Sequence, residues 1–141
     1  MCKMLSLLCA CTKCQNSISS KGLTVALDKK YVVDIKGKQF VTYAGLLSFA
    51  HDIGLRSIET DLVRLEKTES GILALFSATV TSNDGNVFMG YGDATDKNVG
   101  KMIRPHLIRM AETRAKSRAL RDFCNIDLCS VEELGGSDTD F

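Results

Sequence analysis

The feature that most limits how this chain can fold is the stretch 97–123, where apolar residues recur with a helical period. Five of them share one helical face: Ile103, Leu107, Ala111, Ala115 and Ala119. Residues three or four apart in sequence lie on the same side of an α-helix. We therefore predict one helix from Arg104 to Cys124, with Pro105 in the first turn, where proline removes no intrahelical hydrogen bond. Because alanine adds little bulk, this helix is expected to lie close against a flat partner such as a β-sheet.

The same stretch holds much of the positive charge of the chain. Eight of the 18 Lys and Arg residues fall within it, although the formal net charge of the whole chain is only +1. They are Lys97, Lys101, Arg104, Arg109, Arg114, Lys116, Arg118 and Arg121. The positive charge is therefore local, and it indicates an anionic partner for this stretch.

Three of these residues, Arg114, Arg118 and Arg121, fall on one line along the predicted helix. We call them the arginine stripe. The line borders the apolar face, so we expect the guanidinium groups to lie side by side and to repel one another unless an anion binds them. A row of guanidinium groups suits a phosphate backbone. The hypothesis is that the stripe lines an open groove for nucleic acid, whereas Arg109 and Lys116 point to the other side as a solvated face.

The chain before this helix alternates between strand and turn signals. Residues 31–43 read as a β-hairpin around Gly37, residues 44–54 as a short helix that stops at Gly54, and residues 56–66 as a strand. Residues 72–81 and 86–92 form a second hairpin around the Asn-Asp-Gly turn at 83–85. Gly90 and Gly92 indicate a bend or a close backbone approach. The predicted fold class is α+β: a β-hairpin, a short helix and a three-stranded antiparallel meander, packed on one long C-terminal helix.

The two ends of the chain differ from the middle. Residues 1–22 contain four cysteines, Cys2, Cys9, Cys11 and Cys14, which suit a loosely ordered leader with reduced thiols better than a metal site. Residues 23–134 are expected to form the single folded domain, with a capping box at 130–133 and with Cys124 and Cys129 as small buried groups. Residues 135–141 form an acidic tail, read as a solubilising end or as a segment that binds a basic surface.

Composition and motifs argue against several functional classes. No apolar run approaches the length of a membrane span, so we expect a cytoplasmic protein without a membrane partner. No phosphate-binding loop for ATP occurs, and no cofactor or metal is expected. Two alternatives stay open. One is a nuclease in which Asp93, Asp96 and Glu112 hold a metal, and the other is an RNA-binding or scaffold module.

Several residues of the long helix resemble a known family. Ala111 and Thr113, the run Arg118-Ala119-Leu120-Arg121, and then Phe123 and Asn125 are similar to the A-x-T, R-A-L-R and F-x-N signature of the Rad-fifty-two-type single-strand annealing proteins. Ile35-Lys36-Gly37, Asp84-Gly85 and Gly90-Tyr91-Gly92 occur in the order seen in that family. The likeness covers about residues 30–134, and the end of the helix looks like the bacterial and phage branch, which includes DNA-damage-response annealing proteins.

The resemblance implies a β-β-β-α core that assembles into a homo-oligomeric ring and binds single-stranded DNA in a groove floored by the helix. Arg118 and Arg121 match basic positions of the family, whereas Ser117 stands where the family often has lysine. Arg114 is our own addition to this set. The other candidates for phosphate contacts are Lys97, Lys101, Arg104, Lys29 and Lys30. The implied function is ATP-independent annealing of complementary strands in recombination and repair, with no catalytic residue.

Overall fold

The computed structural model describes residues 26–69 and 71–135, which fold as an α+β unit. Within these residues, three short 3-10 turns accompany the main elements: η2 (Lys29–Tyr31), η3 (Arg104–His106) and η4 (Val131–Glu133). In chain order the main elements are β1 (Val32–Ile35), β2 (Lys38–Val41), α1 (Tyr43–Ile53), β3 (Leu55–Thr68), β4 (Gly71–Ser82), β5 (Val87–Thr95) and α2 (Leu107–Cys124). This order confirms the predicted fold class, including the long C-terminal helix, which begins at Arg104 as a 3-10 turn.

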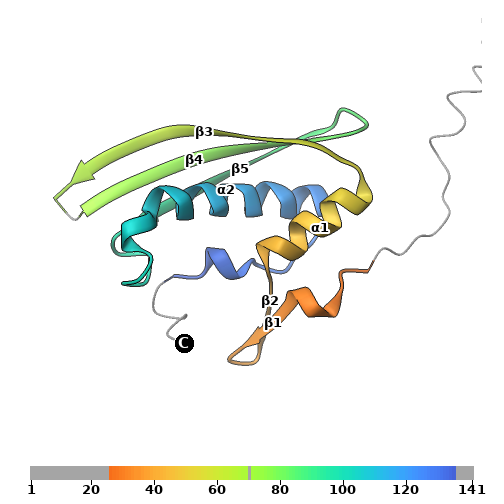
Figure 1. The fold of residues 1–141 in the computed structure, drawn as a ribbon, viewed down its shortest axis with the longest axis horizontal. Coiled ribbons are helices and arrows are strands. Elements are labelled where there is room, and N and C mark those ends of the chain that lie inside the picture. The colour runs from red at the N-terminus through yellow and green to blue at the C-terminus, as the bar shows by residue number, and fades with distance from the viewer. Residues whose placement is uncertain (1–25, 70, 136–141) are drawn as a thin grey trace, which may run out of the picture.

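The sheet and the long helix form two layers. Strands β3, β4 and β5 pair antiparallel in that order, and α2 runs beneath β4 and β5 (Figure 1). On the inner face of β4, Ala74, Ala78 and Val80 are fully buried. Strand β3 forms the edge of the sheet away from β5. Every described residue of the chain from 61 to 69 is exposed. One half of this strand therefore has no partner layer within the described residues.

The close approach predicted at the glycines of β5 is confirmed. A Cβ atom on Gly90 would lie 2.6 Å from the Ala119 nitrogen and 2.9 Å from the Ala115 carbonyl oxygen. A Cβ atom on Gly92 would overlap the backbone of Ala111 and Ala115. Because the strand lacks side chains where the helix has only methyl groups, the two backbones come almost into contact. This seam fixes how α2 is rotated against the sheet.

The segment after α2 joins the two halves of the fold. The Val41 N–H donates to the Cys129 carbonyl at 3.0 Å, which attaches this segment to β2. The Glu132 carboxylate accepts a hydrogen bond from the Tyr43 N–H at 3.1 Å and so caps the start of α1. The predicted capping box is present, with Ser130 and Glu133 bonded to each other. In Figure 1, η4 lies on the side of α2 that faces away from the sheet.

The main core lies between α1, α2 and the sheet. Its largest fully buried apolar side chains are Leu46, Leu120, Val41 and Val80, and burial of each contributes roughly 1.5–3 kcal/mol. Cys124 is buried there as expected, but the expectation for Cys129 is wrong, because Cys129 is exposed while its backbone bonds to β2. The cysteine leader and the acidic tail, except Gly135, lie outside the described residues.

Candidate nucleic-acid interface

The structure places the first residue of the arginine stripe inside the protein. Arg114 is only 3% exposed. Its Nε donates to the Glu132 carbonyl at 2.7 Å, and its Nη1 donates to the Asp93 carbonyl at 2.8 Å and to the Asn98 side-chain oxygen at 3.1 Å. Its Nη2 donates to the carbonyls of Asn98 and Leu134, both at 3.0 Å. All three nitrogens of the guanidinium are therefore bonded to acceptors of the same chain.

Arg118 and Arg121 share one carboxylate. Glu133 lies 3.3 Å from Arg118 Nε and 2.9 Å from Arg121 Nη1, and its side chain is only 11% exposed. Arg118 Nη1 also donates to the Tyr91 carbonyl at 2.6 Å and lies 3.5 Å from Asp93. The carbonyls of Tyr91 and Asp93 belong to β5, so Arg118 and Arg114 together cover the outer edge of the sheet.

These contacts shift the ionisation of the groups involved. Burial lowers the pKa of Arg114, with the carboxylate of Asp93 opposing that shift. For Arg121 burial opposes the charged form, but the hydrogen bond and charge of Glu133 outweigh it and raise the pKa. Burial likewise disfavours the charged form of Glu133, yet hydrogen bonds from Ser130 and Arg121 lower its pKa below the ordinary 4.5. The pair Arg121–Glu133 is thus held ionised.

The expectation of an open groove lined by the whole arginine stripe is wrong. The geometry predicted for the side chains is right, since all three fall on one line beside the apolar face. The chain itself supplies their partners: Glu133 is the anion for Arg118 and Arg121, and the carbonyls of residues 132 and 134 accept hydrogen bonds from Arg114. Arg114 is unavailable to a ligand, whereas Arg118 stays 38% and Arg121 21% exposed at their side chains. The stripe binds the C-terminal turn η4 to α2.

A second group of cations lies at the opposite end of α2 and in the loop before it. We call it the cationic end; its members are Lys97, Lys101, Arg104 and Arg109, and all four are exposed. Within the described residues, none of these side chains takes part in an ion pair or a hydrogen bond. Arg104 stands in the first helical turn, where the helix dipole disfavours a cation. These charges therefore do not serve the stability of the helix and remain available to an anion.

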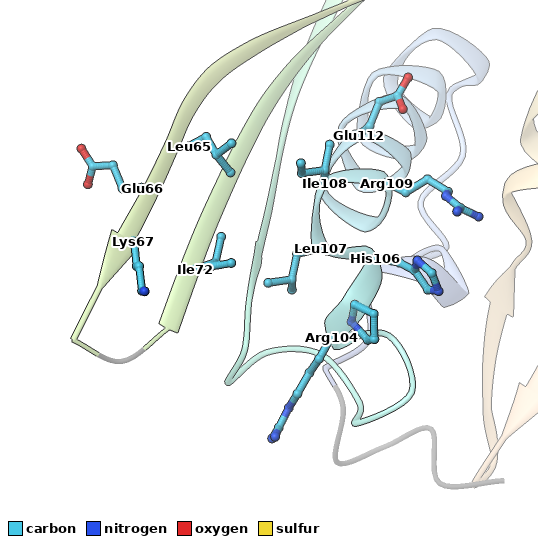
Figure 2. A pocket seen from close by; sticks show the side chains of 11 residues that line it. Leu65, Glu66, Lys67, Ile72, Arg104, His106, Leu107, Ile108, Arg109 and Glu112 are labelled. Carbon is cyan, nitrogen blue, oxygen red and sulfur yellow. The ribbon is translucent and has the colours of Figure 1, made fainter.

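An open groove borders the cationic end. It has a volume of about 630 Å³ and lies between the start of α2 and the ends of β3 and β4 (Figure 2). Leu65, Ile72 and Ile108 line it and are 48%, 43% and 50% exposed. Lys67 lines it from β3, and Arg104 and Arg109 from the helix. The groove combines an apolar floor with cations on both sides.

The two acids that line the groove already have partners. Glu66 pairs with Arg64 at 2.7 Å, and Glu112 pairs with Lys116 at 3.2 Å and accepts a hydrogen bond from Thr60. Their charges are therefore compensated, and the unpaired charge around the groove is positive.

The three carboxylates considered for a nuclease are not brought together. Asp93 contacts Arg118 and Asn98, Asp96 accepts the Ile72 N–H at 2.9 Å, and Glu112 lies against Lys116. Across residues 26–69 and 71–135 no three His, Cys, Asp or Glu side chains are grouped so that they could hold a metal ion. The geometry gives no support to the nuclease alternative.

The two lysines near the first strand lie elsewhere. Lys29 and Lys30 belong to η2, which Figure 1 shows at the other end of the molecule from the start of α2. Both are exposed, and Lys30 pairs with Asp28 at 2.9 Å. Within the described part of one molecule, these lysines do not join either cationic group.

Sequence reasoning missed one residue of the groove, Lys67. Arg109 is exposed, as expected of a solvated face, and it also lines the groove. The pairing of Lys67 with Ile72 across β3 and β4 brings it to the side of the sheet that faces α2. The bulge between Leu62 and Arg64 reverses the alternation of β3, so the side on which Lys67 lies could not be read from the sequence.

Comparisons with known proteins do not identify the chain. No protein-family model matches it, and no curated protein matches it either. In the part of the chain that the structure describes, neither helix is long and apolar enough to span a membrane. Functional inference therefore rests on the site itself and on the resemblance of the long helix.

Proposed function

We propose that this protein binds single-stranded DNA through its phosphate backbone and anneals complementary strands, without ATP, as a homo-oligomer. The phosphates are bound first by the cationic end of α2, with Arg118 as a peripheral contact. The arginine stripe serves mainly to hold the C-terminal turn. This assignment keeps the activity implied by the resemblance of the helix and changes the residues that carry it.

The observation that carries the proposal is a set of four exposed cations without partners among the described residues, gathered within residues 97–109 of a chain whose net charge is +1. Neutralising phosphates releases the counterions condensed on a nucleic acid, and this supplies affinity that does not depend on sequence. Annealing needs such contacts, because the bases must stay free to test their pairing.

The groove suits a single strand better than a duplex. Its apolar floor at Leu65, Ile72 and Ile108 can shelter unpaired bases from water. A duplex gains nothing from such a floor, because its bases are already stacked inside it. Among the described residues no Phe, Tyr or Trp lines it, so their contact with the bases is apolar rather than aromatic stacking and carries little sequence preference. The cations on the two sides of the groove, Lys67 and the pair Arg104 and Arg109, can then contact the phosphates.

Apolar surface on the outer side of the sheet supports self-association. Val87, Met89 and Tyr91 alternate along β5 on the face opposite α2 and are 58%, 54% and 53% exposed. An apolar row of this kind can serve as a contact surface between copies of the chain. An oligomer repeats the cationic end in every copy, which multiplies the few phosphate contacts of one molecule.

Two assays test the proposal. Anisotropy of a labelled oligonucleotide measures binding, and mixing of complementary fluorescent strands measures annealing, both with EDTA and without ATP. We expect tight binding at low salt and annealing faster than that of the free strands. Light scattering should report a mass well above the 15.4 kDa of one chain.

A competition assay distinguishes DNA binding from the alternative, an RNA-binding module. Unlabelled single-stranded DNA should displace the probe more effectively than structured RNA of the same length. Preference for the RNA, or no acceleration of annealing by a protein that binds DNA, would contradict the proposed function.

A further inference from the structure

The groove also fits a segment of the chain itself. Residues 136–141, Gly-Ser-Asp-Thr-Asp-Phe, carry two carboxylates, Asp138 and Asp140, and the aromatic Phe141, with no Lys or Arg. The groove offers cations at Lys67, Arg104 and Arg109 around an apolar floor. We propose that this acidic segment docks in the groove of its own molecule, with Phe141 on the floor and the two aspartates against the cations.

Charge selects this segment over the other stretch outside the described residues. Residues 1–25 contain Lys3, Lys13 and Lys21 and no acid, so their charge has the same sign as the rim of the groove. Like charges repel across such a contact, whereas two aspartates complement it. An aromatic ring beside Leu65 and Ile108 buries apolar area on both partners.

The distances allow the contact within one molecule. The Leu134 carbonyl accepts a hydrogen bond from Arg114 on α2 at 3.0 Å, so the last described residues lie beside this helix. Leu107, at the floor of the groove, lies roughly 10 Å from Arg114 along the helix axis at 1.5 Å per residue. Six extended residues span roughly 20 Å, which is about twice this axial separation.

Docking would make the segment a competitor of nucleic acid for the same cations. This consequence rests on the proposed function, whereas the docking itself does not. A strand with many phosphates replaces two aspartates readily, because it brings more charge and is held by several copies of the protein at once. The segment then keeps weaker anions out of the groove and raises the selectivity for long strands.

The first test observes the docking without DNA in the full-length chain. Methyl NMR signals of Ile72 and Ile108 should move in Phe141→Ala, because an aromatic ring shifts the signals of nearby methyl groups. Asp138→Asn/Asp140→Asn should move them in the same direction, with the signal of Ile35 in the distant hairpin as the control. Signals of Ile72 and Ile108 that stay unchanged in both variants would overturn the docking, and so would shifts that vanish on dilution.

The second test measures the affinity for single-stranded DNA at low salt. Asp138→Asn/Asp140→Asn should bind about twofold to tenfold more tightly than the parent, as expected when two exposed ion pairs no longer compete. Shifted methyl signals with unchanged affinity would uphold the docking and overturn DNA binding in this groove. Unshifted signals with strong DNA binding would overturn the docking alone.

Discussion

In the middle and last turns of α2, three arginines bind acceptors of their own chain, whereas at the start of the helix and in the loop before it four cations face solvent. Arg114 donates five hydrogen bonds and is almost fully buried. Arg104, ten residues earlier, is exposed in the first helical turn. Arginine thus has two roles along this stretch, one in the fold and one as a free surface cation. The acceptors that lie nearest to each arginine decide which role it takes.

The difference shows why a row of arginines is ambiguous evidence for a nucleic-acid site. Arginines that border a buried face need an anion, and a segment folded beside them can provide it. Here Glu133 and the carbonyls of η4 do so, which makes the stripe part of the fold. Cations without a partner are the stronger indication of an external ligand, and these lie at the other end of the helix.

The largest effect is expected at Arg114. Arg114→Met should lower the free energy of unfolding by about 3–5 kcal/mol, because several buried carbonyls would lose their donor. Urea denaturation measures this loss. If the variant were as stable as the parent and lost only DNA affinity, the division between the two ends of the helix would be wrong.

The seam between β5 and α2 should be nearly as sensitive. Gly92→Ala is expected to cost about 2–3 kcal/mol, since the added methyl group overlaps the backbone of Ala111 and Ala115. Gly100→Ala is the matched control, because a Cβ atom there has nothing within 4 Å. Thermal or urea unfolding of both variants measures the difference, and equal stabilities would contradict the close approach of the two backbones.

A smaller effect with a pH signature is expected at Glu133. Its pKa is lowered in the folded state, so its contribution to stability is present above the ordinary 4.5 and is lost as the pH falls through the folded value. Glu133→Gln should cost about 1–3 kcal/mol at neutral pH and flatten the acid limb of the stability curve. The control Glu59→Gln changes an exposed acid on β3. Parallel acid limbs for Glu133→Gln and the parent would count against the shared ion pair.

The cationic end should contribute least to stability. Arg104→Ala/Arg109→Ala is expected to change the free energy of unfolding by no more than about 0.5 kcal/mol, because both side chains are exposed and neither takes part in an ion pair or hydrogen bond with another described residue. Removing Arg104 even relieves an unfavourable charge at the start of the helix. Urea denaturation beside Arg114→Met makes the comparison direct, and a loss as large as that of Arg114→Met would assign the cations to the fold.

The elements of this fold could be predicted from local patterns, but the partners of its charged residues could not. Gly54 ends α1 in a left-handed conformation, as expected of a helix stop. The alanines of α2 pack against Gly90 and Gly92. These features depend on short-range periodicity and on glycine, which has no side chain. The ion pairs of Glu133 depend on where the chain returns after α2, a long-range property that charge spacing along one helix does not contain.

The salt dependence of single-stranded DNA binding tests the central claim most directly. For single strands, log K falls with log salt by roughly 0.7 per neutralised phosphate. The double variant Lys101→Ala/Arg104→Ala should therefore flatten the slope of log K against log salt by about 1.4 and weaken binding at low salt. The control Lys38→Ala/Arg56→Ala removes two exposed charges elsewhere and should keep the slope of the parent. If the folded Lys101→Ala/Arg104→Ala protein retained both the slope and the affinity of the parent, the cationic end would not be where DNA binds.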